Sequence, residues 1–589
     1  MQSDDKTSSE LGFYRSVRNT LPRVEVLSED QLETLHQTSL RVLEELGIRV
    51  LNEEARDLLV AAGCELRDDM MVHFPKDLVT EKVAKAPGEM VWRGGNGMAI
   101  DIGSDTLHFG PGAGCPNVTD VERGRRAGSL AEYVDFTRLQ QHFDIIPFLG
   151  PSIEPQDIPI HERHLITAKV QVEQSEKVPW VFARGTGQVL DSFEIIRIAR
   201  GLSEEDFKKG VYTYTVINTN SPRQIDIPMA QGIIDFARWG QPTVITPFCL
   251  SGAMAPITET GSLTLSHAEA MAGITLAQVV NPGAPVIYGA FSSNVNMKSG
   301  APVFGTPEHI RTNFGAGQLA RHVGIPWRSA TGTAGNAPDV QSAAETQLGL
   351  WGAVLGGANI IFHSAGWLEG GLTISYEKFV MDLEVCQTVA QAMKPVEATE
   401  EAMGFDAIAE VQPGGHFFDA GQTMARYSDQ FYEPLIRDWS NFGQWEEAGA
   451  IQTVEQAQAM WRQVLKDFVP PALPAERQAA LDAFVAANPE VATAVSNFPE
   501  NISDGSITGI EATLRMSLDD FLPEQFEGFG FNASYTYADS SLSGAITGND
   551  IRIPGYSDNV WSGDIYYENH GWRSRISARH RSGFLSEVP

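Results

Sequence analysis

Cysteine is scarce in this sequence. Only four are found among 589 residues, Cys64, Cys115, Cys249 and Cys386, and no two of them form a C-x-x-C pair. This spacing argues against a zinc or iron–sulfur site built on thiolates, and a disulfide framework is not expected in a chain of this size. We interpret the four cysteines as packing residues.

Long apolar runs and the familiar catalytic signatures are also missing. No stretch approaches the roughly 18 uncharged apolar residues of a transmembrane helix, and the polar segment 1–19 lacks the apolar core of a signal peptide. We therefore expect a cytoplasmic protein. There is no G-x-S-x-G, H-E-x-x-H or P-loop motif. The pair His161 and His164 has metal-ligand spacing, but without a third matched ligand it favours surface or capping roles.

Basic residues are few. Lys and Arg total 43 against 75 Asp and Glu, which gives a formal net charge of −32. Binding to nucleic acid or to an anionic membrane is driven by Lys and Arg, so neither partner is expected. With 42% hydrophobic residues the composition is globular, and the length suits one large domain plus a smaller piece.

Short apolar runs alternate with helical segments through most of the chain. Strand-like runs occur at 144–149, 179–184, 211–217, 243–248, 285–291, 325–330 and 359–364, and helical segments lie between them at, for example, 161–177, 227–239, 263–280, 307–323 and 340–356. Such alternation indicates βαβ units and a parallel sheet. We predict a (β/α)₈ TIM barrel over residues 106–490, with an eighth strand near 107–118 or 405–411. A doubly wound sheet is the alternative, but no G-x-G-x-x-G phosphate loop supports it.

Two further segments flank the predicted barrel. Residues 1–105 form a helical and mixed extension, with a helix over 28–47 that starts at the capping box of Ser28 and Gln31. Residues 491–589 contain no Lys and alternate in polarity, which predicts an antiparallel β segment.

The richest polar stretch follows the last predicted barrel strand. His363 ends that strand, and a glycine-flanked loop then carries Trp367 and Glu369. A Trp ring attracts an alkylated ammonium through its quadrupole, and a nearby carboxylate offsets the charge. The alternative is that Trp367 packs beneath the loop while Glu369 is solvated.

Two other loops could contribute to a site. One contains Asn336, Asp339 and Glu345, although Asp339 is equally suited to cap the helix that follows. The other is the glycine-rich run 110–117, followed by the arginines Arg123, Arg125 and Arg126.

The stretches 108–120, 125–136, 324–341 and above all HSAGWLEGGLTISYEKFVMD (363–382) resemble the trimethylamine methyltransferase superfamily over about residues 20–490. The resemblance implies a (β/α)₈ barrel that transfers a methyl group from an amine nitrogen to Co(I) of a separate corrinoid protein. The chain itself would then hold no tightly bound cofactor and no metal. The barrel would mainly bind, orient and desolvate the methylated cation.

The segment 331–341, where we expect the pyrrolysine of archaeal trimethylamine enzymes, contains only ordinary residues. The resemblance therefore favours the branch without pyrrolysine, which includes glycine betaine methyltransferases. Trimethylamine or proline betaine as substrate remains an alternative. A non-catalytic betaine-binding barrel and a metal-dependent barrel hydrolase or aldolase are alternatives of other classes.

By this resemblance the substrate pocket is expected at His363, Trp367, Glu369 and Tyr376, with Asn336, Asp339 and Glu345 at its rim. A betaine carboxylate needs a donor, for which Arg328, Arg184 and Arg311 are candidates; no catalytic residue beyond those that orient substrate is expected. The expected partners are a cognate corrinoid protein, a small quaternary amine and further copies of the chain.

The C-terminal segment resembles something different. The phrases at 505–515, 529–540, 552–572 and 573–585 look like strands of a TonB-dependent outer-membrane receptor. About 95 residues are too few to satisfy every strand edge in lipid. We expect a chimeric segment with no transport function of its own.

Overall fold

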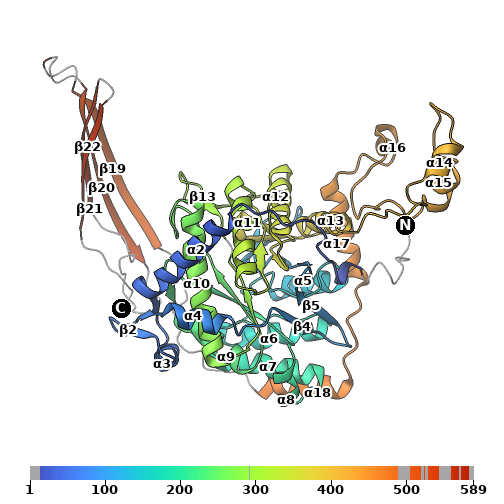
Figure 1. Ribbon diagram of the computed structural model, residues 1–589, viewed down its shortest axis with the longest axis horizontal. Coiled ribbons are helices and arrows are strands. Elements are labelled where there is room, and N and C mark those ends of the chain that lie inside the picture. The colour runs from blue at the N-terminus through green and yellow to red at the C-terminus, as the bar shows by residue number, and fades with distance from the viewer. Residues whose placement is uncertain are drawn as a thin grey trace. The chain divides into compact units, whose positions relative to one another are not determined.

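The computed structural model describes residues 13–290, 292–487, 505–518, 523, 528–542, 559–569 and 572–582. The chain divides into two compact units, Met1–Ser496 and Asn497–Pro589 (Figure 1). Among the described residues, no helix combines the length and the apolarity that a membrane crossing requires.

The first unit is a mixed α/β structure built on buried parallel strands. One sheet has the order β12-β11-β9 and another the order β15-β16-β6. Single parallel bridges join Tyr288 to Trp327, Trp180 to Tyr214 and Phe148 to Val178. The six strands are β6 (His108–Phe109), β9 (Thr215–Thr219), β11 (Thr243–Pro247), β12 (Val286–Tyr288), β15 (Arg328–Ala330) and β16 (Ile360–Phe362).

Most of the predicted strand positions are confirmed, with two differences. The segments 144–149 and 179–184 make only the isolated bridges of Phe148 and Trp180, because Pro147 and Pro179 remove backbone donors. The strand expected near 107–118 is β6, so the alternative position at 405–411 is wrong: Phe405–Glu410 forms the helix α14, which begins at the left-handed Gly404.

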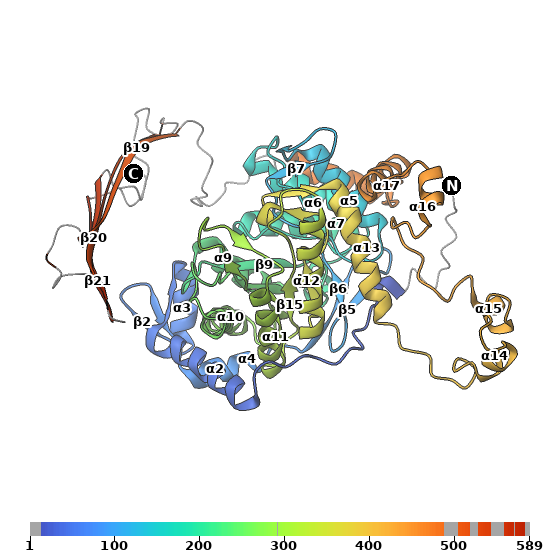
Figure 2. The ribbon, with the colours of Figure 1, turned by 90° about the horizontal axis from the view of Figure 1, so that it is seen from above.

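Helices surround these strands, as Figure 2 shows from above. The predicted alternation is confirmed, and the helix expected over 340–356 has those bounds. The helices are α5 (Leu130–His142), α6 (Ile160–Gln174), α7 (Thr186–Arg200), α8 (Glu204–Lys209), α9 (Ile227–Arg238), α10 (Glu259–Val280), α11 (Pro307–His322), α12 (Val340–Gly356) and α13 (Tyr376–Ala392).

The N-terminal extension packs on one side of this body. Its first described long helix, α2 (Glu29–Arg41), starts at the predicted capping box and contacts α10. The other elements are a π-helical turn (Val42–Leu46), β1 (Ile48–Val50), α3 (Glu53–Ala61), β2 (Glu65–Arg67), β3 (Met71–His73) and α4 (Lys76–Val83), with β10 (Gln224–Ile225) completing the sheet β10-β1-β3-β2.

A hairpin of β4 (Glu89–Arg93) and β5 (Ala99–Gly103) lies at the amino ends of the parallel strands. Its fully buried Trp92 forms a bridge with Val211, just before β9. The Trp92 ring stacks on Tyr214 at 4.5 Å and meets Phe148 edge-on. The hairpin therefore fills this end of the core with aromatic side chains.

A small sheet at the opposite end, the carboxyl ends of the strands, carries the candidate site. Its order is β17-β18-β7-β8, from β7 (Asn117–Thr119), β8 (Arg126–Ala127), β17 (Trp367–Leu368) and β18 (Thr373–Ser375), with a 3-10 turn at Glu369–Gly371. Nearby, β13 (Asn294–Val295) pairs with β14 (Pro302–Val303).

Residues 394–452, here called the arm, follow α13, and the part of the arm around α14 stands away from the rest of the first unit in Figure 2. The arm contains α14, α15 (Gly421–Arg426) and α16 (Phe442–Glu447). The chain then returns through α17 (Thr453–Asp467), which packs on α13 and α5, and α18 (Ala475–Ala487), which packs on α7.

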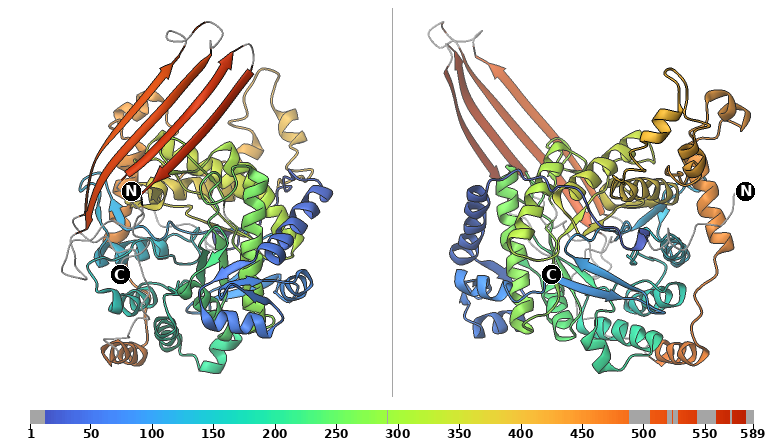
Figure 3. Two further views of the ribbon diagram at one scale, coloured as in Figure 1. Left: turned by 90° about the vertical axis from the view of Figure 1, so that its left-hand side faces the viewer. Right: turned by 45° about the vertical axis from the view of Figure 1, so that its right-hand side comes forward.

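The second unit contains four long antiparallel strands that lie side by side (Figure 3). They are β19 (Gly505–Ser517), β20 (Phe529–Leu542), β21 (Asn559–Asn569) and β22 (Trp572–Arg581). Cross-strand pairs such as Tyr535 with Trp561, with ring centroids 4.3 Å apart, and Arg575 with Asp564 support the register.

Candidate functional site

The centre of the candidate site is a stack of His363 on Trp367. His363 follows β16 in a left-handed conformation, with φ of +59°, and its N–H donates to the carbonyl of Pro111. Its ring centroid lies 4.2 Å from that of Trp367, with only 12° between the planes. Phe304 contacts the Trp367 ring edge-on at 5.1 Å.

Two glycines make room for the indole. A Cβ at Gly332, where φ is +139°, would lie 2.1 Å from the Trp367 ring, and a Cβ at Gly371 would lie 2.4 Å from it. Any larger residue would displace the ring or the loop. Trp367 is only 6% exposed, so most of its surface packs against neighbouring residues. This agrees with the alternative in which Trp367 packs beneath the loop.

Arg328 connects this stack to the strands. It lies on β15 with its guanidinium carbon 4.7 Å above the Phe362 ring, and Nη2 is 3.4 Å from Nε2 of His363. Burial lowers the pKa of Arg328 to about 9. Burial and the charge of Arg328 together hold the pKa of His363 well below its usual value, so the imidazole is neutral.

Glu369 is held by an arginine from the other glycine-rich loop. Its two carboxylate oxygens each accept from Nε of Arg125 at 3.0 Å. The side chain is 17% exposed, so it is neither fully solvated nor uncompensated. Sequence reasoning grouped Arg125 with its neighbours and missed this pairing, because 244 residues separate the partners.

Glu345 supports the same loop from α12. Its carboxylate accepts from the hydroxyl of Thr333, from the N–H of Ala334 at 2.8 Å and from the amide of Gln341. The carbonyl of Thr333 in turn accepts from the N–H of Gly370 at 2.9 Å. Glu345 therefore positions the segment that carries Glu369.

The other two residues predicted at the rim, Asp339 and Asn336, are exposed on the loop that precedes α12. Asp339 is exposed and caps α12, accepting from the N–H of Ser342 in a capping box, as the capping alternative requires. Asn336 is exposed on the same loop.

A buried ion pair that sequence reasoning missed anchors the loop before Trp367. Nζ of Lys378 lies 2.6 Å from a carboxylate oxygen of Asp382, and the two side chains are 1% and 3% exposed. Lys378 also donates to the hydroxyl of Thr346 at 3.0 Å, and Asp382 accepts from the N–H of Gly366 at 2.8 Å. The i, i+4 spacing of opposite charges within an apolar helix was the available signal.

Tyr376 lies elsewhere. Its hydroxyl donates to Asp135 of α5 at 2.8 Å, and its ring packs against Phe136 and Trp461 of α17. The structure therefore does not bring Tyr376 to the stack of His363 and Trp367.

The two other candidate arginines are also engaged elsewhere. Arg184 bonds Glu154 at 2.9 Å beside Arg163, near the loops that follow Phe148 and Trp180. Arg311 is about half exposed and pairs with Glu259. Of the three candidates, only Arg328 contacts His363.

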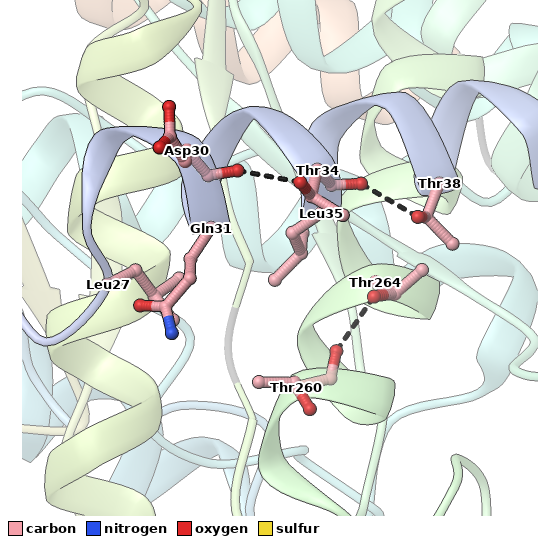
Figure 4. A pocket seen from close by; sticks show the side chains of 8 residues that line it. All are labelled: Leu27, Asp30, Gln31, Thr34, Leu35, Thr38, Thr260 and Thr264. Carbon is pink, nitrogen blue, oxygen red and sulfur yellow. Dashed lines mark hydrogen bonds between the residues drawn. The ribbon is translucent and has the colours of Figure 1, made fainter.

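A surface cavity of about 390 Å³ lies between α2 and α10 (Figure 4). It is lined by Leu27, Asp30, Gln31, Thr34, Leu35, Thr38, Thr260 and Thr264. None of these belongs to the site around His363. Within the described ranges, no group of three or more His, Cys, Asp or Glu residues is placed to hold a metal ion, and His164 bonds Asp191.

Comparison with known proteins relates the first unit to methyltransferases. The family "Trimethylamine methyltransferase (MTTB)" matches residues 2–491. Glycine betaine methyltransferase of Desulfitobacterium hafniense (strain Y51) is 34% identical over 469 residues, which are 79% of this chain and 97% of that protein. Trimethylamine methyltransferase MttB of D. hafniense (strain DSM 10664 / DCB-2) is 27% identical over 438 residues, 74% of this chain and 88% of the relative.

Among solved structures, the crystal structure of the hydroxylamine MtmB complex gives a TM-score of 0.46 at 11% identity and covers 79% of this chain and 92% of that one. The family match spans the strands, the helices and every residue of the site described above. The chain belongs to the trimethylamine methyltransferase (MTTB) family.

Proposed function

We propose that this chain transfers a methyl group from a quaternary amine that also carries a carboxylate, a compound of the glycine betaine type, to Co(I) of a corrinoid held by a partner protein. The chain is an amine methyltransferase. What the proposal adds is the class of amine and the residues that bind it, namely Arg328, His363 and the loop of Trp367 and Glu369.

The buried Arg328 beside His363 is the observation that carries the choice of substrate. Two unit charges 4 Å apart interact by about 1 kcal/mol in water and about 4 kcal/mol at an effective dielectric of about 20. A purely cationic amine near Arg328 would be repelled by an energy of this order. A betaine can place its carboxylate at the guanidinium and its ammonium farther away, toward Glu369, whose carboxylate it would share with Arg125.

The proposed methyl transfer requires no proton transfer by the protein at the nitrogen. Co(I), the second substrate, supplies the electron pair of the new bond to carbon, while the N–CH₃ pair stays on nitrogen. The amine leaves as a neutral tertiary amine, so no acid is needed at the nitrogen. The chain binds the zwitterion, orients one methyl group outward and excludes water.

We also propose that the strands form the (β/α)₈ barrel expected from the sequence. The parallel bridges at Phe148, Trp180 and Trp327 support this arrangement, as does the parallel bridge between Cys115 and Ile153. In such a barrel the site occupies the carboxyl ends of the strands, where barrel enzymes carry their chemistry.

The test incubates the full chain with a Co(I) corrinoid protein and either glycine betaine, proline betaine, carnitine or trimethylamine, and follows methylation of cobalt by absorbance. We expect methylation with a betaine and much less with trimethylamine. R328M should abolish betaine turnover, whereas the matched variant R311M, at an arginine on the surface, should not.

Circular dichroism of R328M checks that the variant has folded, and R328K keeps the charge if it has not. Equal turnover of trimethylamine and betaines would contradict the proposed substrate class. Tight betaine binding by calorimetry without methylation of any corrinoid would instead indicate a binding protein.

A further inference from the structure

Glu369, the acidic residue of the candidate site, already pairs with a cation of the chain. Its two carboxylate oxygens each accept from Nε of Arg125 at 3.0 Å. We propose, on the basis of the function proposed above, that Arg125 is a positioning residue that acts through Glu369. Its guanidinium takes up the charge of this carboxylate as the bound ammonium loses its own charge.

The charge beside Glu369 changes during the proposed reaction. As the methyl group leaves, the electron pair of the N–CH₃ bond stays on nitrogen and Co(I) supplies the pair of the new bond, so the nitrogen becomes neutral. A carboxylate beside that nitrogen therefore stabilises the bound substrate more than the transition state, which slows the transfer. A second cation on the carboxylate reduces this difference, and it spares the product complex a partly buried anion without a partner.

Glu369 is fixed beside the ring that the ammonium contacts in the proposed function. Its backbone is left-handed, with φ of +54°, and its N–H donates to the carbonyl of Gly335 at 2.9 Å. A positive φ is uncommon outside glycine, so the surrounding contacts hold this backbone. The loop then returns against Trp367, since a Cβ at Gly371 would lie 2.4 Å from the indole.

The charge of Glu369 also reaches the interior of the site. Burial raises the pKa of the thiol of Cys115, which is fully buried, and the negative charge of Glu369 raises it further. The carboxylate therefore lies between this interior thiol and Arg125, and acts on both.

Arg125 reaches Glu369 from a turn that is anchored elsewhere. The turn joins β7 and β8, and its other two arginines, Arg123 and Arg126, pair with Asp120 at 2.8 and 2.9 Å. The Asp120 side chain is 1% exposed, whereas that of Arg125 is 50% exposed. Two arginines thus hold the turn, and the third is presented to the loop of Glu369. Its half-exposed side chain has room to shift when an ammonium shares the carboxylate and to return when that charge is lost.

A purely structural tie between the two loops predicts a different outcome. If Arg125 only fixed the position of the Glu369 loop, its removal would loosen the site, so the substrate would bind less well and react more slowly. If Arg125 balances charge, its removal leaves Glu369 uncompensated, so the ammonium binds more tightly while its methyl group transfers more slowly. The two roles have opposite effects on affinity, and one variant separates them.

The test measures the dissociation constant of glycine betaine by calorimetry on the full chain, and the single-turnover rate of cobalt methylation at saturating betaine. R125Q should lower the constant and the rate by about fivefold each, the upper range for a half-exposed ion pair. R125K keeps the cation and should restore both values to near those of the wild type. In the E369Q background R125Q should change neither value, because no carboxylate charge remains to be balanced.

The matched control is R311Q. Arg311 holds Glu259 in the same geometry, with Nε 3.0 and 3.1 Å from the two carboxylate oxygens, and its side chain is 49% exposed. This control should leave affinity and rate unchanged.

Weaker betaine binding by R125Q would overturn the proposal and leave the proposed function standing. So would wild-type affinity and rate in R125Q, or an equal effect of R125Q in the E369Q background. A wild-type chain that methylates no corrinoid from any betaine would overturn both.

Discussion

The buried pair of Lys378 and Asp382 allows a quantitative test of how the Trp367 loop is held. In K378M, Asp382 keeps its hydrogen bond from Gly366 but loses its cation in a position that is 3% exposed. Removing one partner of a buried ion pair costs about 3–5 kcal/mol. For a unit of roughly 490 residues the unfolding entropy is about 1 kcal/mol/K, so we expect the melting temperature to fall by roughly 3–5 °C.

Differential scanning calorimetry measures this shift, and betaine binding by calorimetry measures its effect on the loop. The control K209M removes a solvent-exposed i, i+4 partner of Glu205 and should leave both quantities unchanged. The double variant K378M/D382L should recover part of the lost stability, because no unpaired charge remains. Equal melting temperatures of K378M, K209M and wild type would refute the reasoning.

Three other outcomes follow from the same structure. G332A should abolish betaine turnover, because its Cβ would collide with the Trp367 ring; circular dichroism and turnover check this, and wild-type activity would contradict it. Burial lowers the pKa of both His36 and His267, so the unfolded state binds more protons as the pH falls below about 6.5. The urea midpoint should therefore be highest above pH 6.5 and decline toward pH 5; replacing both histidines with Gln should flatten this profile, and an unchanged slope would count against it. Truncation after residue 490 should leave activity and solubility equal or better, and loss of folding would argue against a separate C-terminal segment.

Hydrophobic periodicity predicted most elements of the first unit. The helices are long enough for their pattern to specify them, as α12 illustrates at residues 340–356. The strands predicted at 144–149 and 179–184 are reduced to isolated bridges. Pro147 and Pro179 lack the backbone N–H that a regular strand ladder requires. The alternative strand at 405–411 was wrong because a short apolar run does not distinguish a strand from a short helix, and here the run belongs to α14.

Fewer of the contacts in the candidate site could be predicted from the sequence. His363 and Trp367 are neighbours along the chain, so their association could be predicted from a single loop. The pairing of Arg125 with Glu369 depends on contacts between distant loops, which local patterns do not encode. Tyr376 follows His363 by 13 residues in the sequence, but its side chain packs against α5 and α17 and not against His363.

The aromatic hairpin around Trp92 has a consequence for the order of events in the proposed reaction. If the proposed barrel is correct, Trp92 closes its amino end by packing on Tyr214 and Phe148, and the small amine and the large corrinoid protein would share the carboxyl ends of the strands as a common entrance. The amine would then enter first, because the docked partner would cover its route, and the demethylated product would leave only after the partner does. Steady-state kinetics should accordingly show a compulsory order of binding, with substrate inhibition by the corrinoid protein at high concentration.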